Sequence, residues 1–305
     1  MKDNDSAVID GFYADPDLIF SEKDNCFYLY PTTDGKLNWQ GTYFECFSSK
    51  DLIDWEKKGI ILDLTKDVSW AIDKAWAPSA IEKKIDNEYH YFFYFCAEQK
   101  IGVATSTSPF SGFKDKGTPL ITDKYRDPSI DTGQEIDPYV FHDKKNDSYY
   151  LFWGNMYLAR AELNSDMVSI KEESIAYITP NDGSFREAVS VFYRKDRYYY
   201  IWSENDTRHP DYRLRYGYNF SIEDPLIIPK DNVVLEKYEA LNILATGHCD
   251  VINKPNSDEF YLFYHQFSLQ DGQLWNDESG YHRELQKKIL CFDDDGAIKP
   301  INHSI

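Results

Sequence analysis

The stretch Ala14-Asp15-Pro16-Asp17-Leu18-Ile19-Phe20 places a carboxylate at the start of a short hydrophobic segment, and the chain returns to this arrangement four more times. Residues 136–141 (Ile-Asp-Pro-Tyr-Val-Phe) repeat it closely, and residues 186–192 (Arg-Glu-Ala-Val-Ser-Val-Phe) repeat it with Glu in place of Asp. Two further copies carry Trp76 and His248 near that point. The copies are spaced roughly 50–60 residues apart, a period that indicates a propeller or a repeat array.

An aromatic run follows each copy after a polar turn. The runs span residues 27–30, 91–95, 149–153, 198–202 and 260–264. Tyr and Phe suit pleated, half-buried surfaces, so each run predicts a second strand beside the first. Turn signals such as Asp34-Gly35 and Asp295-Gly296 separate short segments, and long amphipathic helical patterns are nearly absent.

The repeat therefore predicts an all-β fold. In the first unit we expect strands near 17–20, 26–31, 41–48 and 55–61, and four strands make one propeller blade. The second unit has strands near 78–83, 89–95 and 100–106 and a weaker fourth, and the later units cover about 136–178, 187–236 and 246–300. We expect one catalytic domain over residues 1–305, a five-bladed β-propeller with four antiparallel strands per blade.

The charge of the chain limits its partners. The formal net charge is −19 and the isoelectric point is near 4.7, with acidic residues spread along the whole sequence. Such a chain repels phosphate backbones, which argues against a nucleic-acid partner and favours a neutral substrate. We expect no membrane partner, and the oligomeric state is left open.

The cysteines and the N-terminal residues bear on the cellular location of the protein. Five cysteines are scattered without a CxxC pair, which argues against a disulfide framework and for a reducing environment. Residues 1–6 are polar and lack the apolar core of a signal peptide. We therefore predict a cytoplasmic protein, or a secreted one if a leader has been removed.

In a propeller the first strand of each blade lines the axis, so the starts of these strands meet at one end of a central funnel. This predicts that Asp15, Trp76, Asp137, Glu187 and His248 surround one mouth. Two carboxylates across a pocket are what hydrolysis of a glycosidic bond requires, one as a protonated acid and one as an ionised base. A neighbouring anion raises the pKa of a carboxyl group by repulsion, so Asp137 can keep Glu187 protonated.

These residues resemble family 43 of the glycoside hydrolases over nearly the whole chain. The motifs that carry the resemblance are Ala-Asp-Pro-Asp at 14–17, Trp-Ala-Pro at 76–78, Ile-Asp-Pro at 136–138, Arg-Glu at 186–187, Thr-Gly-His at 246–248 and Gly-Tyr-His-Arg-Glu at 280–284. The resemblance implies a five-bladed propeller and an inverting enzyme that acts mostly on arabinofuranosides and xylosides. Many members follow the acid with Gly-Pro, whereas Ala188-Val189 stand here.

The resemblance also implies roles for individual residues. Asp15 would be the general base, Glu187 the general acid, and Asp137 the residue that orients the acid and raises its pKa. Trp76 would lie against the sugar that is released, and Arg283 would bind that sugar or steer a carboxylate. No cofactor is required, but near the axis His248 would adjoin a structural calcium ion or a water cluster, the ion being held often through water.

We predict an inverting, exo-acting glycosidase that releases α-L-arabinofuranose from oligosaccharides. A β-xylosidase or a β-galactofuranosidase of the same family is the alternative. Two less favoured hypotheses are a propeller that only binds sugars and a glycoside phosphorylase. A phosphorylase would need a cluster of basic residues to hold phosphate, and only Arg186 and Arg283 stand near the blade mouths. Two segments outside the repeat, 62–76 and 205–216, are candidates for recognition loops.

Overall fold

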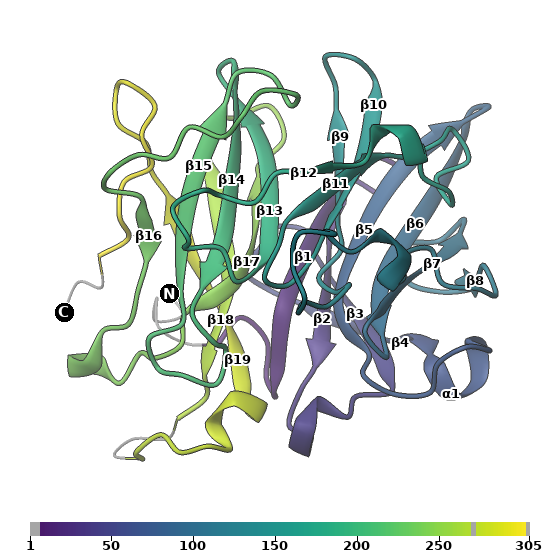
Figure 1. The fold of residues 1–305 in the computed structure, drawn as a ribbon. Coiled ribbons are helices and arrows are strands. Elements are labelled where there is room, and N and C mark those ends of the chain that lie inside the picture. Colours follow the sequence, from purple (N-terminus) through teal and green to yellow (C-terminus); the bar gives the residue numbers. More distant parts are fainter. Residues whose placement is uncertain (1–6, 270–272, 303–305) are drawn as a thin grey trace.

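The computed structural model describes residues 7–269 and 273–302, and residues 1–6, which carried part of the localisation prediction, lie outside these ranges. The five-bladed propeller is confirmed (Figure 1). Blade one holds β1 (Tyr13–Ser21), β2 (Cys26–Thr33), β3 (Tyr43–Ser49) and β4 (Glu56–Asp63). Blade two holds β5 (Trp76–Ile85), β6 (Glu88–Ala97), β7 (Lys100–Ser106) and β8 (Lys114–Asp115). Blade three holds β9 (Tyr139–Asp143), β10 (Ser148–Trp153), β11 (Ala159–Glu162) and β12 (Ala176–Tyr177).

Blade four holds β13 (Glu187–Arg194), β14 (Arg197–Glu204), β15 (Arg213–Asn219) and β16 (Val233–Leu235). Blade five holds β17 (Gly247–Asn253), β18 (Phe260–Phe267) and β19 (Arg283–Leu290). Helical structure in the described ranges is short: α1 (Leu64–Asp67) and the 3-10 turns η1 (Leu37–Trp39), η2 (Asp123–Tyr125), η3 (Glu172–Ser174), η4 (Glu239–Leu241) and η5 (Ser279–Tyr281). None of the helices in these ranges has the length and apolar character that a bilayer crossing needs.

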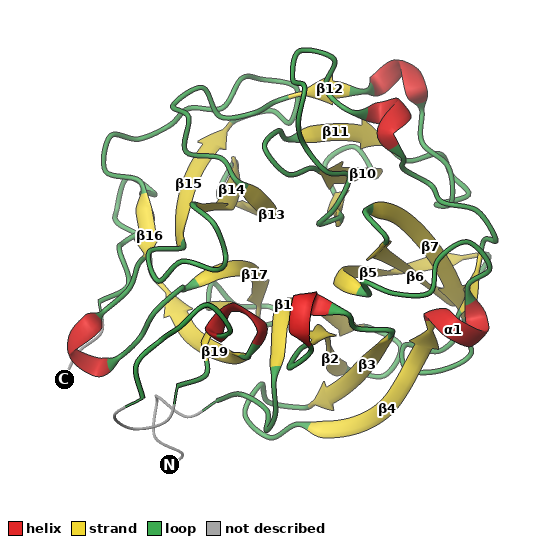
Figure 2. Ribbon diagram, turned by 60° about the horizontal axis from the view of Figure 1, so that its bottom comes forward, coloured by secondary structure: helices red, strands yellow, loops and turns green. Residues whose placement is uncertain are grey.

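Each sheet is an antiparallel meander whose first strand is innermost, and Figure 2 shows β1, β5, β13 and β17 around the axis. The aromatic runs fill the spaces between blades. Phe93 and Phe95 of β6, for example, are fully buried and pack edge-on against Phe44 of blade one, with ring centroids 5.2 and 5.8 Å away. Burial of these rings supplies the main stabilisation of a propeller, because each sheet is covered on both faces by its neighbours.

A left-handed residue stands at the inner mouth of every blade. These residues are Asp15, Ala77, Asp137, Ala188 and His248, with φ between 38 and 63°. In four blades the pairing of the first two strands also shifts there, as between Ala14 and Asp17. A positive φ costs a non-glycine residue on the order of 1–3 kcal/mol, so surrounding contacts must hold it. The sequence repeat is therefore a repeated kink, and Trp76 and Glu187 precede the kinked residue while Asp15, Asp137 and His248 occupy it.

Two positions further along, the side chains form a ring of hydrogen bonds that joins every blade to the next. Its members are Asp17, Ser79, Tyr139, Ser190 and Asp250. Ser79 Oγ donates to Asp17 at 2.9 Å, and the backbone N–H of Leu18 donates to Asp250 at 2.8 Å, which joins blade five to blade one. The remaining links run from Val140 N to Ser79 Oγ, from Tyr139 Oη to Val191 O and from Ser190 Oγ to Asp250 Oδ1. This buried ring fixes the blades, and with them the kinked residues, relative to one another.

The segment that precedes blade one also joins the first and last blades of the propeller. The backbone N–H of Val8 donates to the carbonyl of Leu285 in β19 at 2.8 Å, so residues that precede blade one contact the outermost strand described for blade five. After β19 the chain forms an isolated bridge between Phe292 and Ile298, and the N–H of Ile301 donates to the carbonyl of Val234 in β16 of blade four.

Candidate active site

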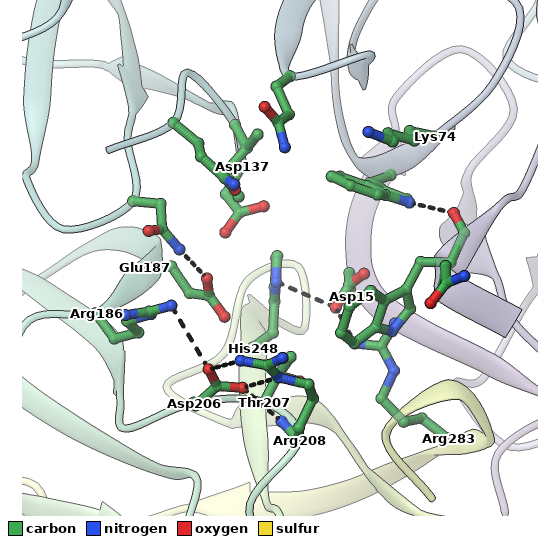
Figure 3. A pocket seen from close by; sticks show the side chains of 17 residues that line it. Asp15, Lys74, Asp137, Arg186, Glu187, Asp206, Thr207, Arg208, His248 and Arg283 are labelled. Atoms are coloured by element: carbon green, nitrogen blue, oxygen red, sulfur yellow. Dashed lines mark hydrogen bonds and ion pairs between the residues drawn. The ribbon is translucent and has the colours of Figure 1, made fainter. Parts of the chain in front are cut away.

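A cavity of about 390 Å3 opens where the kinked residues meet. The predicted site residues that line it are Asp15, Trp76, Asp137, Glu187, His248 and Arg283, contributed by all five blades. Figure 3 shows Asp15 and Arg283 on one side of this pocket and Glu187 with Arg186 on the other, with His248 between them. The carboxylates thus face a common space although more than a hundred residues separate Asp15 from the others in the sequence.

Asp15 is buried among cationic and ring nitrogen groups. Its Oδ1 lies 3.2 Å from Nη1 of Arg283, 3.2 Å from Nδ1 of His248 and 3.1 Å from Nδ1 of His265. Burial by itself would raise the pKa of Asp15, but the positive charge of Arg283 and the contacts of the two histidines outweigh it and hold the pKa well below its ordinary value. Asp15 is therefore an ionised carboxylate.

Arg283 is itself held in place by a second carboxylate. Its Nε donates to Asp34 Oδ2 at 2.8 Å, and its backbone N–H donates to the same oxygen at 3.1 Å. The guanidinium is buried, so the fork that it makes with Asp34 leaves Nη1 directed at Asp15. Arg283 therefore contacts the carboxylate of Asp15, and a contact between Arg283 and the sugar stays a prediction.

The pKa values of the two histidines near Asp15 are displaced in opposite directions. Burial favours neutral His248, but the negative charge of Asp15 and their contact outweigh this, so the pKa of His248 is raised. Burial, together with the positive charge of Arg283, lowers the pKa of His265 to about 3. Asp15 is therefore ion-paired with Arg283 and in contact with His248, whose protonated form it stabilises, and with the neutral ring of His265.

His248 does not belong to a protein-built cation cage. Calcium takes six to eight oxygen ligands. Residues 7–269 and 273–302 contain no group of three or more His, Cys, Asp or Glu side chains arranged to hold a metal ion. The raised pKa of His248 and its contact with Asp15 also disfavour the ring as a direct ligand. The residues present therefore do not fit a calcium ion bound directly by side chains.

Glu187 is held by one hydrogen-bond donor on each of its oxygens. Tyr212 Oη donates to Oε1 at 2.9 Å, and the amide of Asn155 donates to Oε2. Burial raises the pKa of Glu187, against the lowering influence of the Arg186 charge and of the Tyr212 hydrogen bond. Ala188, which follows Glu187, has a φ of 63°, a backbone state that favours glycine. The carboxyl group is therefore fixed in position and inclined to hold a proton.

Asp137 is the third buried carboxyl group of the pocket. Burial raises its pKa well above the ordinary value; the charge of His248 opposes this, and the charges of Glu187 and Asp15 add to it. Asp137 and Glu187 thus repel each other when both are ionised, and this repulsion raises the pKa of Asp137. That Asp137 in turn raises the pKa of Glu187 stays a prediction. For Glu187, however, burial is the first cause of the raised pKa.

Trp76 forms part of the wall with a second tryptophan. Its Nε1 donates to the carbonyl of Trp39 at 2.6 Å, and Nε1 of Trp39 donates to the carbonyl of Gly280 at 2.8 Å. Lys74 Nζ lies 5.8 Å from the centre of the Trp76 ring. The chain of bonds fixes a flat indole at the edge of the cavity, the kind of surface on which a sugar ring packs.

The sequence did not reveal several residues that support this site. Asn155 follows the second strand of blade three, and Tyr212 lies in the segment 205–216 that falls outside the repeat. Tyr212 packs against Gly247, where a Cβ atom would come within 2.0 Å of the ring, but a glycine alone does not identify its partner from the sequence. Nothing in the sequence marks His265 or Asp34 as site residues, because their neighbours in the chain are typical of an ordinary strand or turn.

Comparisons with known proteins agree with this geometry. The sequence model of "Glycosyl hydrolases family 43" matches residues 5–298. A β-D-galactofuranosidase, xynD, of Aspergillus niger is 30% identical over 97% of this chain and 84% of its own length. A xylosidase/arabinosidase of Bacteroides ovatus is 25% identical over 98% of each chain.

Solved structures show the same fold. An arabinoxylan arabinofuranohydrolase of this family from Bacillus subtilis superposes with a TM-score of 0.80 at 23% identity, covering 97% of this chain and 67% of that one. CoXyl43, a β-xylosidase/α-arabinofuranosidase from a compost metagenome, gives a TM-score of 0.76 at 22% identity, covering 97% and 96%. From the match over residues 5–298 and the 30% identical relative, the chain belongs to family 43 of the glycosyl hydrolases.

Proposed function

We propose that this glycosidase is an inverting, exo-acting furanosidase that releases α-L-arabinofuranose from short oligosaccharides, with the whole propeller as one catalytic domain. The observation that carries the proposal is the opposite displacement of two pKa values in one cavity: Asp15 is held ionised and Glu187 is inclined to hold its proton. Two carboxyl groups whose environments drive their pKa values apart are suited to act as a base and an acid.

In the proposed reaction Glu187 gives its proton to the oxygen of the bond that breaks. Asp15 takes a proton from a water molecule that attacks the anomeric carbon from the opposite face, so the configuration inverts. Glu187 then carries the negative charge and Asp15 the proton, and exchange with solvent restores both. Arg283 and His248 keep Asp15 ionised until the attacking water gives up its proton, and Trp76 packs against the ring of the released sugar.

A calcium ion held through water near His248 stays a prediction, and no step of this reaction depends on it. Exo action stays a prediction as well, and the cavity of about 390 Å3 has room for a terminal sugar. The cytoplasmic location likewise stays a prediction.

Release of β-D-galactofuranose is the second candidate. The 30% identical relative is a β-D-galactofuranosidase. α-L-arabinofuranose and β-D-galactofuranose share the configuration of the ring and differ in the exocyclic group, so one set of ring contacts serves both. A β-xyloside presents a six-membered ring, and the 25% identical xylosidase/arabinosidase supports it less strongly.

We expect the highest kcat/KM on a furanoside when 4-nitrophenyl α-L-arabinofuranoside, β-D-galactofuranoside and β-D-xylopyranoside are compared. Early proton NMR of the better furanoside should show the inverted anomer before mutarotation. A preference for the xyloside would contradict the furanose assignment, and a retained anomer would contradict the mechanism.

Tyr212→Phe should move the basic limb of the kcat/KM profile to higher pH. The hydroxyl of Tyr212 donates to Glu187 and stabilises the ionised form, so its loss raises the pKa of the acid. Full pH profiles of both enzymes measure the shift. Tyr218→Phe, on the strand β15 that follows Tyr212 and packed against Arg197 and Phe220, is the matched control. A limb that moves to lower pH in Tyr212→Phe would refute this role.

A further inference from the structure

Two arginines and one aspartate form a charged cluster on the Glu187 side of the pocket. The cluster consists of Arg186, Asp206 and Arg208, with Thr207 between the last two, and all four line the cavity. Figure 3 shows Arg186 and Asp206 beside Glu187, away from Asp15. Asp206 to Arg208 belong to the segment 205–216, which interrupts the blade repeat.

The position of this cluster relates it to the leaving group, an argument that rests on the proposed function. The general acid must contact the oxygen that departs, and the attacking water arrives from the base on the other face. The first sugar of the leaving group therefore lies against the wall that carries Glu187. That wall is formed by Arg186, which precedes the acid in the chain, and by residues 206–208.

The cations of this wall are unequally paired. Arg208 makes a fork with Asp206, with Nε–Oδ1 at 2.8 Å and Nη2–Oδ2 at 2.6 Å, and these bonds lower the pKa of Asp206 to about 2. Arg186 comes only within 3.7 Å of Asp206, and its Nη1 contacts the weak acceptor Sδ of Met156. Arg186 is thus the less closely paired of the two guanidinium groups.

Two buried polar atoms of the wall also lack a partner. Nε of Arg186 and Oγ1 of Thr207 are shielded from solvent, and neither makes a hydrogen bond within the described part of the chain. Both residues line the cavity. Because buried polar groups are nearly always hydrogen-bonded, we expect a ligand or water to satisfy them.

We propose that this wall is a subsite for an anionic leaving group, specifically a hexuronate. Two guanidinium groups and one carboxylate leave the cluster with a net positive charge, within a chain of net charge −19. A guanidinium fork matches a planar carboxylate in a bidentate manner. The substrate class that follows is an acidic oligosaccharide in which the terminal furanose is attached to a uronic acid.

Phosphate as a nucleophile would require a different arrangement. It would have to attack from the Asp15 side, where Arg283 is already bonded to Asp34 and Asp15. The under-partnered Arg186 lies on the opposite side, next to the acid. The cluster therefore fits an anion on the leaving group rather than phosphate in the role of water.

The test compares two probes of similar shape, one that carries a carboxylate and one that is neutral. Wild-type enzyme is titrated by NMR with methyl α-D-glucopyranosiduronate and with methyl α-D-glucopyranoside at low ionic strength. We expect the uronate to bind about tenfold more tightly, the effect of one good charge-assisted contact. Arg186→Gln should remove the difference, Arg186→Lys should keep part of it, and added salt should weaken it. Lys195→Gln, which removes a charge at the far end of β13, should preserve it.

Kinetic measurements separate this inference from the proposed function. The uronate should inhibit hydrolysis of a nitrophenyl furanoside more strongly than the neutral glycoside does. Equal binding of the two probes, with furanosides still cleaved, would overturn the uronate subsite alone. Uronate binding through Arg186 without cleavage of any furanoside would refute the proposed function and leave the anion site. Cleavage that requires phosphate and yields a sugar 1-phosphate would overturn the assignment of the wall to the leaving group.

Discussion

Asp15→Asn and Glu187→Gln should each lower kcat roughly 10²- to 10⁴-fold on a natural oligosaccharide, the range that a positioned acid or base contributes. The two variants should differ in their dependence on the leaving group. A nitrophenolate departs with little protonation, so Glu187→Gln should recover much of its loss on the aryl furanoside. Asp15→Asn should lose as much on one substrate as on the other, because activation of water is needed in both. Steady-state kinetics on the two substrates measure this contrast.

Both variants should remain folded. Asn and Gln keep the shape of the acids, and Arg283 retains its bonds to Asp34 when the charge of Asp15 is removed. Circular dichroism and thermal unfolding provide the check, and Glu223→Gln, an exposed acid bonded to Arg160 outside the pocket, provides a matched control. A folded Glu187→Gln enzyme with wild-type turnover on the oligosaccharide would refute the role of Glu187. A loss in Asp15→Asn that disappears on the aryl substrate would exchange the two roles.

The sequence was sufficient to predict the blades because each one begins with the same arrangement. The spacing of the Asp-Pro motifs and the aromatic runs predicted where the innermost strands lie, and the observed β1, β5, β9, β13 and β17 begin at these motifs. The hydrophobic pattern defines these strands locally, since alternation and turn residues are short-range properties. The family membership predicted from the motif order is confirmed as well.

The backbone kinks at the blade mouths could not be predicted from the sequence. Nothing in the residue types indicates that Ala77 and Ala188 adopt a positive φ, because alanine is not favoured there. The sequence repeat therefore aligned Glu187 with Asp15. In the structure the kinked residue of blade one is Asp15 itself, whereas in blade four it is Ala188, one residue after Glu187. Such a backbone state is imposed by tertiary contacts, among them the ring that includes Asp17 and Ser190.

The hydrogen-bond and ion-pair partners of the carboxyl groups could not be predicted from the sequence either. Tyr212, Asn155 and His265 reach the site from loops or from a second strand, and their contacts depend on how neighbouring blades are set. The pKa displacement of Asp15 results from Arg283, which is 268 residues away. Local pattern identifies the carboxylates, but their protonation follows from contacts between blades.

Asp137→Asn should move the basic limb of kcat/KM to lower pH and cause a large loss of rate at neutral pH. Asp137 and Glu187 are buried and repel each other as anions, so the last proton of the pair leaves at a higher pH than it would from Glu187 alone. Removal of one carboxyl group lets Glu187 ionise more easily, and less of it stays protonated. The shift is opposite in sign to that expected for Tyr212→Phe.

The loss should shrink on aryl furanosides, which need little protonation of the leaving oxygen. Because burial is the first cause of the raised pKa of Glu187, the limb of the variant should remain above the ordinary value for glutamate. A different account holds that Asp137 only positions its neighbours, and it predicts a rate that falls at every pH while the limb stays in place. Full pH profiles on the oligosaccharide and the aryl furanoside separate these accounts, and an unmoved basic limb would reject the electrostatic role of Asp137.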